Sequence, residues 1–261
     1  MASRKEQREE ARKQREEREA EEAKKQRRKR RIWQFGGGGV ALVAIIVVLI
    51  VVLSSGDDNK GPTKTEAQNT ESLFAGIAQN GITLGNPEAK VTIYEFADLQ
   101  CPFCKQYTMT VFPQLVERYV KPGKVKMVWR NLTFIGPDSV TAARAAAAAG
   151  VQNKLWDFID LFYMNQGTEN TGYVTDKFID NIAKEVGADP AKLKSDQSLP
   201  LVEQQLGQAQ DQAQQFSINS TPSFLLQVGK SKPQKLSYSD FKVEEFAGPI
   251  NKALSQAGGG T

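Results

Sequence analysis

The chain has 261 residues, of which 40% are hydrophobic, enough for one or two domains with a substantial core. The net charge of +4 comes from the N-terminal end: residues 1–31 carry 14 Lys and Arg against 8 Asp and Glu, whereas residues 32–261 carry 20 against 22. Residues 32–261 therefore lack the excess of positive charge that is typical of proteins that bind nucleic acid. The absence of histidine excludes Ser-His-Asp and Cys-His catalysis and removes the commonest transition-metal ligand.

Residues 1–31 consist almost entirely of Arg, Lys, Glu, Gln and Ala. These residue types favour helix, and Glu and Arg recur at spacings that pair on one helix face. The segment is predicted to be a charged cytosolic arm. Both a solvated arm and a segment that binds anionic lipid or a cytosolic partner are compatible with this composition.

Residues 32–56 contain no charged side chain and are predicted to form a single transmembrane helix. The stretch Trp33–Leu53 would span about 31 Å as a helix, which matches a bilayer core of about 30 Å. Gly36–Gly39 weaken the helix, so a secretory signal is the alternative. The basic region is long for a signal, and no Ala-x-Ala-like cleavage site follows Leu53. The positive flank keeps the N-terminus in the cytosol and puts the rest of the chain outside, where disulfides persist.

The next segments are a linker and a folded domain. Residues 57–80 form a mostly polar run, which predicts a flexible tether. Residues 81–257 contain the remaining strand and helix signals and are predicted to be the folded domain.

Both cysteines of the chain lie in Asp98–Lys105, which reads DLQCPFCK. The alternating run Val91–Phe96 predicts a strand before this motif, and apolar residues at helical spacing predict a helix after it. Cys101 is then expected at the helix cap and Pro102 at the first helical position, which suits proline. The free N–H groups and the helix dipole should lower the pKa of Cys101, and Cys104 follows one turn later on the same face. This arrangement favours a redox couple.

Three other interpretations of the pair remain open. A zinc site would use a second pair of Cys or His, and the chain has none. An inert structural disulfide across two residues would close a very small loop and add little stability. The two thiols could also be unrelated reduced cysteines at the start of a helix.

Further elements are predicted along the rest of the domain. They are a strand over Lys124–Trp129, a helical block over about 137–216, a strand over Ser223–Val228, a hairpin partner over Gln234–Ser237 and a final helix over Phe241–Ala257. The aromatic residues of the helical block are interpreted as core.

The stretch GNPEAKVTIYEFADLQCPFCKQY, followed about 120 residues later by NSTPSFLL, resembles the DsbA-like thiol–disulfide oxidoreductases of the thioredoxin superfamily. The resemblance covers roughly residues 81–257. It implies an α/β, thioredoxin-like fold with a helical insertion, here preceded by a single transmembrane helix.

The resemblance also implies a role for individual residues. Cys101 would be the exposed nucleophile and Cys104 the resolving cysteine. Pro222 would be cis and lie beside the disulfide, so that the Thr221 backbone pairs with an extended substrate segment.

Three more residues follow from the same resemblance. Pro102 and Phe103 occupy the positions that tune redox potential and contact substrate. Many strong oxidants of the family have His where this chain has Phe103, and phenylalanine cannot stabilise a thiolate as an imidazole does. Glu95 resembles the buried acid behind the active site that carries protons to or from Cys104; the alternative is an ordinary exposed strand carboxylate.

The predicted function is that of an extracytoplasmic thiol–disulfide oxidoreductase, single-pass in a bacterial cytoplasmic membrane, that oxidises thiols of secreted or exported proteins. A membrane quinone-linked oxidase is the partner that the family implies. No cofactor or metal is needed, because the cysteines carry the electrons. A reductase or isomerase on the same fold and a membrane-tethered binding or scaffold module with an inert disulfide are the alternatives.

Overall fold

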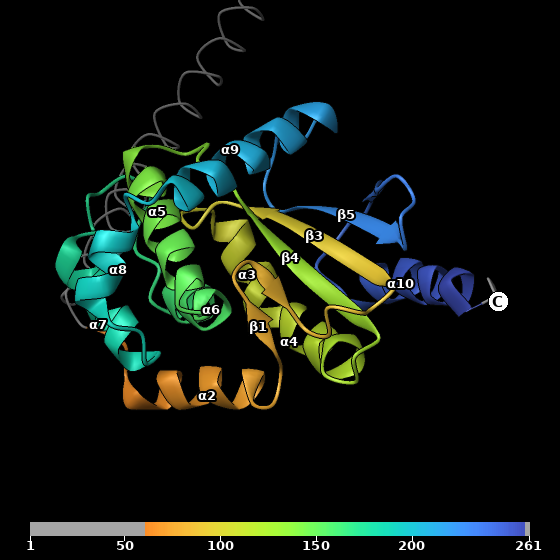
Figure 1. The fold of residues 1–261 in the computed structure, drawn as a ribbon, viewed down its shortest axis with the longest axis horizontal. Coiled ribbons are helices and arrows are strands. Elements are labelled where there is room, and N and C mark those ends of the chain that lie inside the picture. The colour runs from red at the N-terminus through yellow and green to blue at the C-terminus, as the bar shows by residue number, and fades with distance from the viewer. Residues whose placement is uncertain (1–60, 259–261) are drawn as a thin grey trace, which may run out of the picture. The chain divides into compact units, whose positions relative to one another are not determined.

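The computed structural model describes residues 61–258 (Figure 1). The helices are α2 (Lys64–Phe74), α3 (Pro102–Thr110), α4 (Phe112–Leu115), the π-helical turn η1 (Val116–Val120), α5 (Pro137–Val151), α6 (Leu155–Met164), α7 (Asp176–Glu185), α8 (Pro190–Asp196), α9 (Pro200–Gln215) and α10 (Val243–Gly258). The strands are β1 (Gln79–Asn80), β2 (Thr83–Leu84), β3 (Val91–Ala97), β4 (Val125–Asn131), β5 (Ser223–Val228) and β6 (Gln234–Leu236).

The strands form one sheet in the order β1-β2-β4-β3-β5-β6. Strands β3 and β4 are parallel, and β5 pairs with β3 antiparallel. Glu95 is therefore central, opposite Trp129 on one neighbouring strand and Phe224 on the other.

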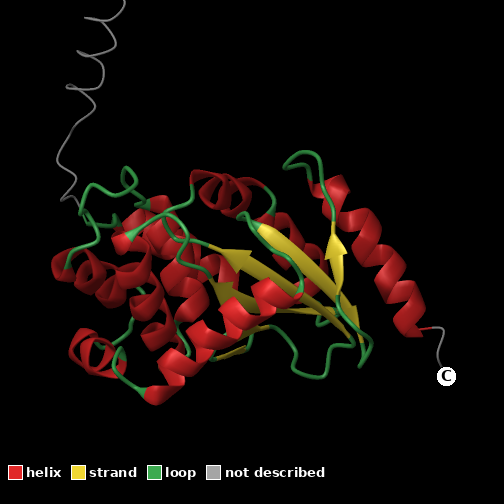
Figure 2. Ribbon diagram, turned by 90° about the horizontal axis from the view of Figure 1, so that it is seen from above, coloured by secondary structure: helices red, strands yellow, loops and turns green. Residues whose placement is uncertain are grey.

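Alternation along β3 separates two hydrophobic clusters, because successive side chains of a strand point to opposite faces. Ile93 belongs to the large cluster that includes residues of α3, α6 and α10, whereas Phe96 belongs to a smaller cluster with residues of α9. Helices consequently flank the sheet on both faces (Figure 2). Glu95 has the same parity as Ile93, so its side chain faces the cluster that contains both cysteines.

The five helices α5 to α9 are inserted between β4 and β5. They correspond to the helical insertion predicted at about 137–216, and they begin at the end of the sheet where β3 and β4 end (Figure 1). The α/β fold with a helical insertion is thus confirmed.

The predicted linker over residues 57–80 is wrong for its described part. Helix α2 begins there with a capping box, in which the Thr63 side chain accepts from the Glu66 N–H and Glu66 bonds back to the Thr63 N–H. The buried Thr70 hydroxyl donates to Asp160 of α6 at 2.6 Å. This segment is a packed part of the domain, because its buried contacts come from residues far along the chain.

The charged arm at 1–31 and the transmembrane helix at 32–56 lie outside the described residues. Within residues 61–258, no helix has the length and apolar character needed to cross a membrane.

Candidate active site

The two cysteines lie where β3 passes into α3. Cys101 is the N-cap of α3, with extended backbone angles, and Pro102 takes the first helical position. Cys104 is one turn further on and fully buried. Both thiols are free in this structure. The predicted strand–CxxC–helix junction is therefore confirmed in detail.

The surroundings of the pair shift the two pKa values in opposite directions. The side-chain hydrogen bond with Cys104 lowers the pKa of Cys101 to about 6, assisted by the Thr221 side chain and by the N–H groups of Cys104 and Phe103, against the opposing effect of burial. Burial, followed by the bond with Cys101, raises the pKa of Cys104 well above its ordinary value. At neutral pH a negative charge on the pair consequently resides on Cys101.

The accessibility of the motif differs from that expected. The resemblance implied an exposed nucleophile, but the exposed fraction of Cys101 is 5%, whereas that of Phe103 is 60%. The Cys101 thiol is covered because it faces the loop before β5, where it donates to the Thr221 carbonyl oxygen at 3.3 Å. The apolar side chain most open to solvent at the motif is therefore Phe103.

The loop before β5 contains the predicted proline. The Thr221–Pro222 peptide bond is cis. The Tyr238 hydroxyl donates to the Pro222 carbonyl oxygen at 2.6 Å, and the Ser223 hydroxyl donates to the Ser220 carbonyl oxygen at 2.7 Å. The structure thus brings Thr221 and Pro222 beside Cys101, as predicted, and adds Tyr238, which the sequence did not single out.

Asp98 organises the three-residue loop between β3 and Cys101. Its carboxylate accepts from the N–H groups of Gln100, Phe134 and Ile135 at 2.8 to 3.1 Å. Its carbonyl oxygen accepts from the Cys101 N–H at 2.9 Å and from the hydroxyl of Tyr163 at 3.0 Å. Asp98 therefore fixes the conformation of the loop that leads from β3 to Cys101.

Sequence reasoning missed Asp98, although an aspartate directly after a strand is a local signal of a loop that its side chain closes. The helical insertion fastens the same loop through Gln166, whose side-chain amide donates to the Leu99 carbonyl oxygen at 2.7 Å. No sequence signal marks that contact, because the two residues are 67 positions apart.

Glu95 is buried, with an exposed fraction of 1%, and one of its carboxyl oxygens has no hydrogen-bond partner in the described part of the chain. Burial raises its pKa to about 8. Burial raises the pKa of Tyr163, and the charges of Cys104 and Glu95 raise it further, so the inner thiol and the acid both influence this side chain. The alternative of an exposed strand carboxylate is therefore wrong.

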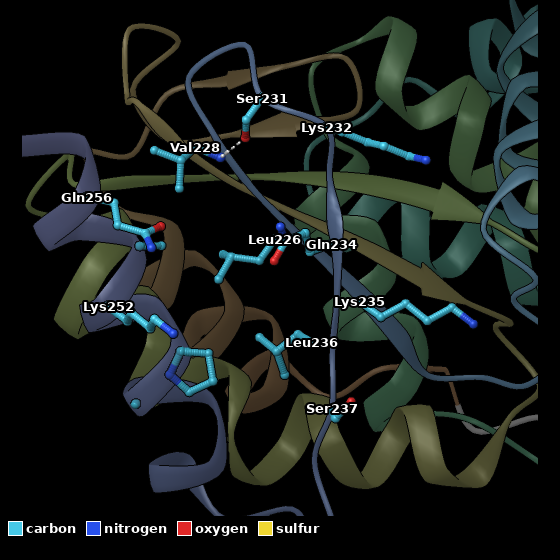
Figure 3. Close-up of a pocket in the computed structure, with 13 residues that line it drawn as sticks. Leu226, Val228, Ser231, Lys232, Gln234, Lys235, Leu236, Ser237, Lys252 and Gln256 are labelled. Atoms are coloured by element: carbon cyan, nitrogen blue, oxygen red, sulfur yellow. Dashed lines mark hydrogen bonds between the residues drawn. The ribbon is translucent and has the colours of Figure 1, made fainter. Parts of the chain in front are cut away.

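A groove of about 320 Å³ opens beside the motif. Its lining includes Phe103, Thr221, Pro222, Tyr238, Asp240 and Phe241. A second cavity, of about 730 Å³, lies between the β5–β6 hairpin and α10 (Figure 3). None of the predicted site residues lines that second cavity. Within residues 61–258, no group of three His, Cys, Asp or Glu side chains could hold a metal ion.

A CxxC pair with opposed pKa shifts, set against a cis-proline loop on this sheet, defines a thiol–disulfide oxidoreductase of the DsbA type. The family model described as Thioredoxin matches residues 78–242, and the chain belongs to that family. A curated relative, "Probable disulfide bond formation protein D" of Bacillus cereus, is 32% identical over 62% of this chain and 76% of its own length. "Disulfide bond formation protein D" of Bacillus subtilis is 29% identical over 54% and 64%.

Solved structures give the same result. BdbD from Bacillus subtilis, in its oxidised form, has a TM-score of 0.58 and 26% identity, covering 69% of this chain and 97% of its own. A thioredoxin-like oxidoreductase from Silicibacter pomeroyi has a TM-score of 0.52 and 29% identity, covering 73% and 98%. The similarity therefore spans the described domain and nearly all of each of these structures.

Proposed function

We propose that this oxidoreductase works in the oxidising direction, giving the Cys101–Cys104 disulfide to the thiols of exported proteins. The observation that carries the proposal is the pKa of Cys101, about 6, beside a Cys104 whose pKa is raised. A thiolate that is stable at neutral pH stabilises the reduced pair, whereas a disulfide has no proton to lose. With a pKa one unit below the working pH the reduced state gains about tenfold, or about 30 mV for a two-electron couple. The reduced enzyme is then a good product, and the oxidised enzyme a good oxidant.

The reaction starts from the oxidised pair. A substrate thiolate attacks the Cys101 Sγ, a mixed disulfide forms, and the bond to Cys104 breaks. Cys104 leaves as a thiolate in surroundings that disfavour its charge, so it takes up a proton. Glu95, with a pKa of about 8, is protonated at neutral pH and is the proposed donor.

A second substrate thiolate then attacks the substrate sulfur of the mixed disulfide. It releases Cys101 as the thiolate that its hydrogen bonds stabilise. In total the substrate loses two electrons and two protons, and the cysteine pair gains the electrons. One proton ends on Cys104 and the other goes to solvent, once Glu95 has regained from solvent the proton that it gave to Cys104.

The remaining residues act by position. The Thr221 backbone is the proposed pairing partner of an extended substrate segment, with Pro222 setting the exposure of that backbone. Thr221 lies directly over the nucleophile, because its carbonyl oxygen is 3.3 Å from the Cys101 Sγ. Pro102 and Phe103 flank the nucleophile, and the exposed Phe103 ring offers substrate an apolar contact.

We place the domain outside a bacterial cytoplasmic membrane, held by residues 32–56 with the N-terminus in the cytosol. The uncharged segment and its basic flank support this placement. The names of the Bacillus relatives, disulfide bond formation proteins, support exported proteins as substrates. Re-oxidation of the pair is assigned to a membrane quinone-linked oxidase.

The test is the reduction potential of the full-length chain in detergent, measured by equilibration with glutathione and dithiothreitol buffers. The expected value is higher than that of thioredoxin, about −270 mV, and lies between it and the value of about −120 mV for DsbA. A value near or below about −270 mV would make the protein a reductant and overturn the oxidising direction. A pair that fails to equilibrate with either buffer would favour the scaffold alternative.

A further inference from the structure

The groove beside Cys101 has a wall of aromatic rings. The rings of Tyr238 and Phe241 stack with centroids 5.5 Å apart and planes 28° apart. Phe103, from the CxxC motif, lines the same groove. Tyr238 is held in place because its hydroxyl bonds to the Pro222 carbonyl oxygen. The groove therefore has aromatic side chains along its wall beside the CxxC motif, and the Phe103 ring, 60% exposed, is the one most open to a ligand.

The only charged side chain among the residues that line this groove is Asp240. One of its carboxyl oxygens accepts from the Phe241 N–H at 2.8 Å, and the other pairs with Lys242 at 2.9 Å. A carboxylate can accept about four hydrogen bonds, so acceptor positions remain on Asp240. The side chain is 55% exposed, which leaves these positions open to a ligand.

The surrounding segment carries an excess of negative charge. Residues 238–245 contain the three carboxylates of Asp240, Glu244 and Glu245 against the single ammonium of Lys242. The pair between Lys242 and Asp240 is exposed on both sides, and such pairs contribute about 0 to 1 kcal/mol. A cation that arrives with a substrate can therefore replace Lys242 at little cost.

Stacked aromatic faces and a carboxylate together match one side chain best. A guanidinium is planar, is less strongly hydrated than an ammonium, stacks on aromatic rings and donates two parallel hydrogen bonds to a carboxylate. An apolar side chain would use the rings but would remove water from Asp240 without replacing it. An acidic side chain would be repelled.

We propose that this groove is a subsite for an arginine side chain of the substrate polypeptide, placed near the cysteine that attacks Cys101. The subsite rests on the proposed function, since it selects among thiol substrates of the same reaction. Its consequence is a preference for cysteines with a basic neighbour. Charge complementarity with residues 238–245 supplies the selection, and the aromatic rings supply the orientation.

The experiment uses the full-length chain, oxidised and in detergent, with peptides that contain two cysteines. At one position beside a cysteine the peptide carries arginine, its neutral isostere citrulline, or glutamate, and the position is varied over two residues on either side. The measured quantity is the second-order rate constant of peptide oxidation for the wild-type chain and for Asp240→Asn. Because arginine also alters the reactivity of the peptide thiol itself, the informative number is the ratio between the two proteins for each peptide.

With arginine at one or more of the tested peptide positions, Asp240→Asn should slow oxidation of the peptide about threefold to fivefold. This is the effect expected from the loss of an exposed ion pair. It should leave the citrulline peptide unchanged and speed the glutamate peptide. The matched control is Asp176→Asn on α7, another exposed aspartate paired with a lysine, which should change none of the three rates.

Other outcomes would contradict the arginine subsite alone or the subsite together with the proposed function. Equal loss for the arginine and citrulline peptides, or no loss for either, overturns the subsite while the oxidase function stands. Failure of the wild-type chain to oxidise even the citrulline peptide overturns the proposed function and the subsite with it.

Discussion

The first turn of α3 separates two regions with opposite chemistry. On the outer side, Cys101 has hydrogen bonds to Cys104, to Thr221 and to backbone N–H groups, and a groove that contains the exposed carboxylate of Asp240 lies beside the motif. On the inner side, Cys104 and Glu95 are both buried, and polar atoms of Glu95, Tyr107 and Trp129 have no hydrogen-bond partner among residues 61–258.

The difference between the two regions assigns the two cysteines their parts. Hydrogen-bond donors favour a charged sulfur, and a buried apolar interior disfavours one. The outer side therefore stores negative charge, and the inner side takes up protons. The same four-residue motif could not produce this asymmetry in a uniform environment, so the surroundings of the motif decide the direction of the reaction.

Replacing either cysteine should have the largest effect on the difference between the two regions. Cys101→Ser removes the attacked sulfur, and we expect the rate of thiol oxidation to fall by at least about a thousandfold. Cys104→Ser removes the leaving group and the sulfur that resolves a mixed disulfide, so single-cysteine substrates linked to Cys101 should persist. Non-reducing gels of the full-length protein with peptide disulfides measure both effects. A stable adduct on Cys104 in Cys101→Ser would contradict the assignment, because it would show that the inner sulfur is the accessible one.

Glu95→Gln tests the inner region alone. The folded pKa of Glu95 is about 8, above the ordinary value of 4.5, so unfolding releases its proton at intermediate pH. Below pH 4.5 the acid is protonated in both the folded and the unfolded state, so ionisation of Glu95 does not reduce the free energy of unfolding. As the pH rises from 4.5 through 8, the free energy of unfolding falls by up to about 1.4 kcal/mol per pH unit. At pH 7 we therefore expect Glu95→Gln to be more stable than wild type by about 3 kcal/mol.

The measurement is the free energy of unfolding in denaturant at several pH values between 5 and 8. The matched control is Glu117→Gln, an exposed carboxylate paired with Lys121, which should leave the pH dependence unchanged. If the free energies of unfolding of wild type and Glu95→Gln changed in parallel with pH, the pKa of Glu95 would not be raised in the folded state. If Glu95 is the proton donor to Cys104, the same variant should also slow thiol oxidation.

Local signals in the sequence predicted much of the fold and the centre of the site. The strand over Ser223–Val228 has the predicted limits, and the helix that starts at Pro102 begins where cysteine and proline require. Alternation placed Glu95 and Ile93 on one face of a strand. It could not show which face was buried, because burial depends on helices elsewhere in the chain.

The misses share a physical cause. Helix α2 stands in a polar run, and its capping box of Thr63 and Glu66 was a usable local signal. Its packing on the domain depends on Asp160, which lies 90 residues away from Thr70. An aspartate after a strand was a local signal for the loop at Asp98, but its bond to the Phe134 N–H reaches another segment, as does the bond of Tyr238 to the Pro222 carbonyl oxygen. No residue pattern near Asp98 or Tyr238 reveals these distant partners.

Tyr238→Phe tests the outer region, and it is the substitution with the smallest expected effect. It deletes one hydroxyl, keeps the stacked ring, and leaves the Pro222 carbonyl oxygen without its 2.6 Å partner. A net loss of about 1 kcal/mol is expected for such a hydrogen bond. Because Tyr238 holds the loop that would pair with substrate, we expect the KM for peptide thiols to rise about threefold to fivefold while kcat stays unchanged.

Tyr94→Phe is the matched control, since its hydroxyl also makes a single hydrogen bond, to Gln227 at 2.7 Å, and its ring packs with the cluster on the opposite face of the sheet. Both variants should lose similar stability, but only Tyr238→Phe should change KM. If both changed KM equally, the effect would be general loosening of the sheet. A rise in KM confined to Tyr238→Phe would show that the cis-proline loop is held for substrate from outside the motif, by a residue 137 positions beyond Cys101.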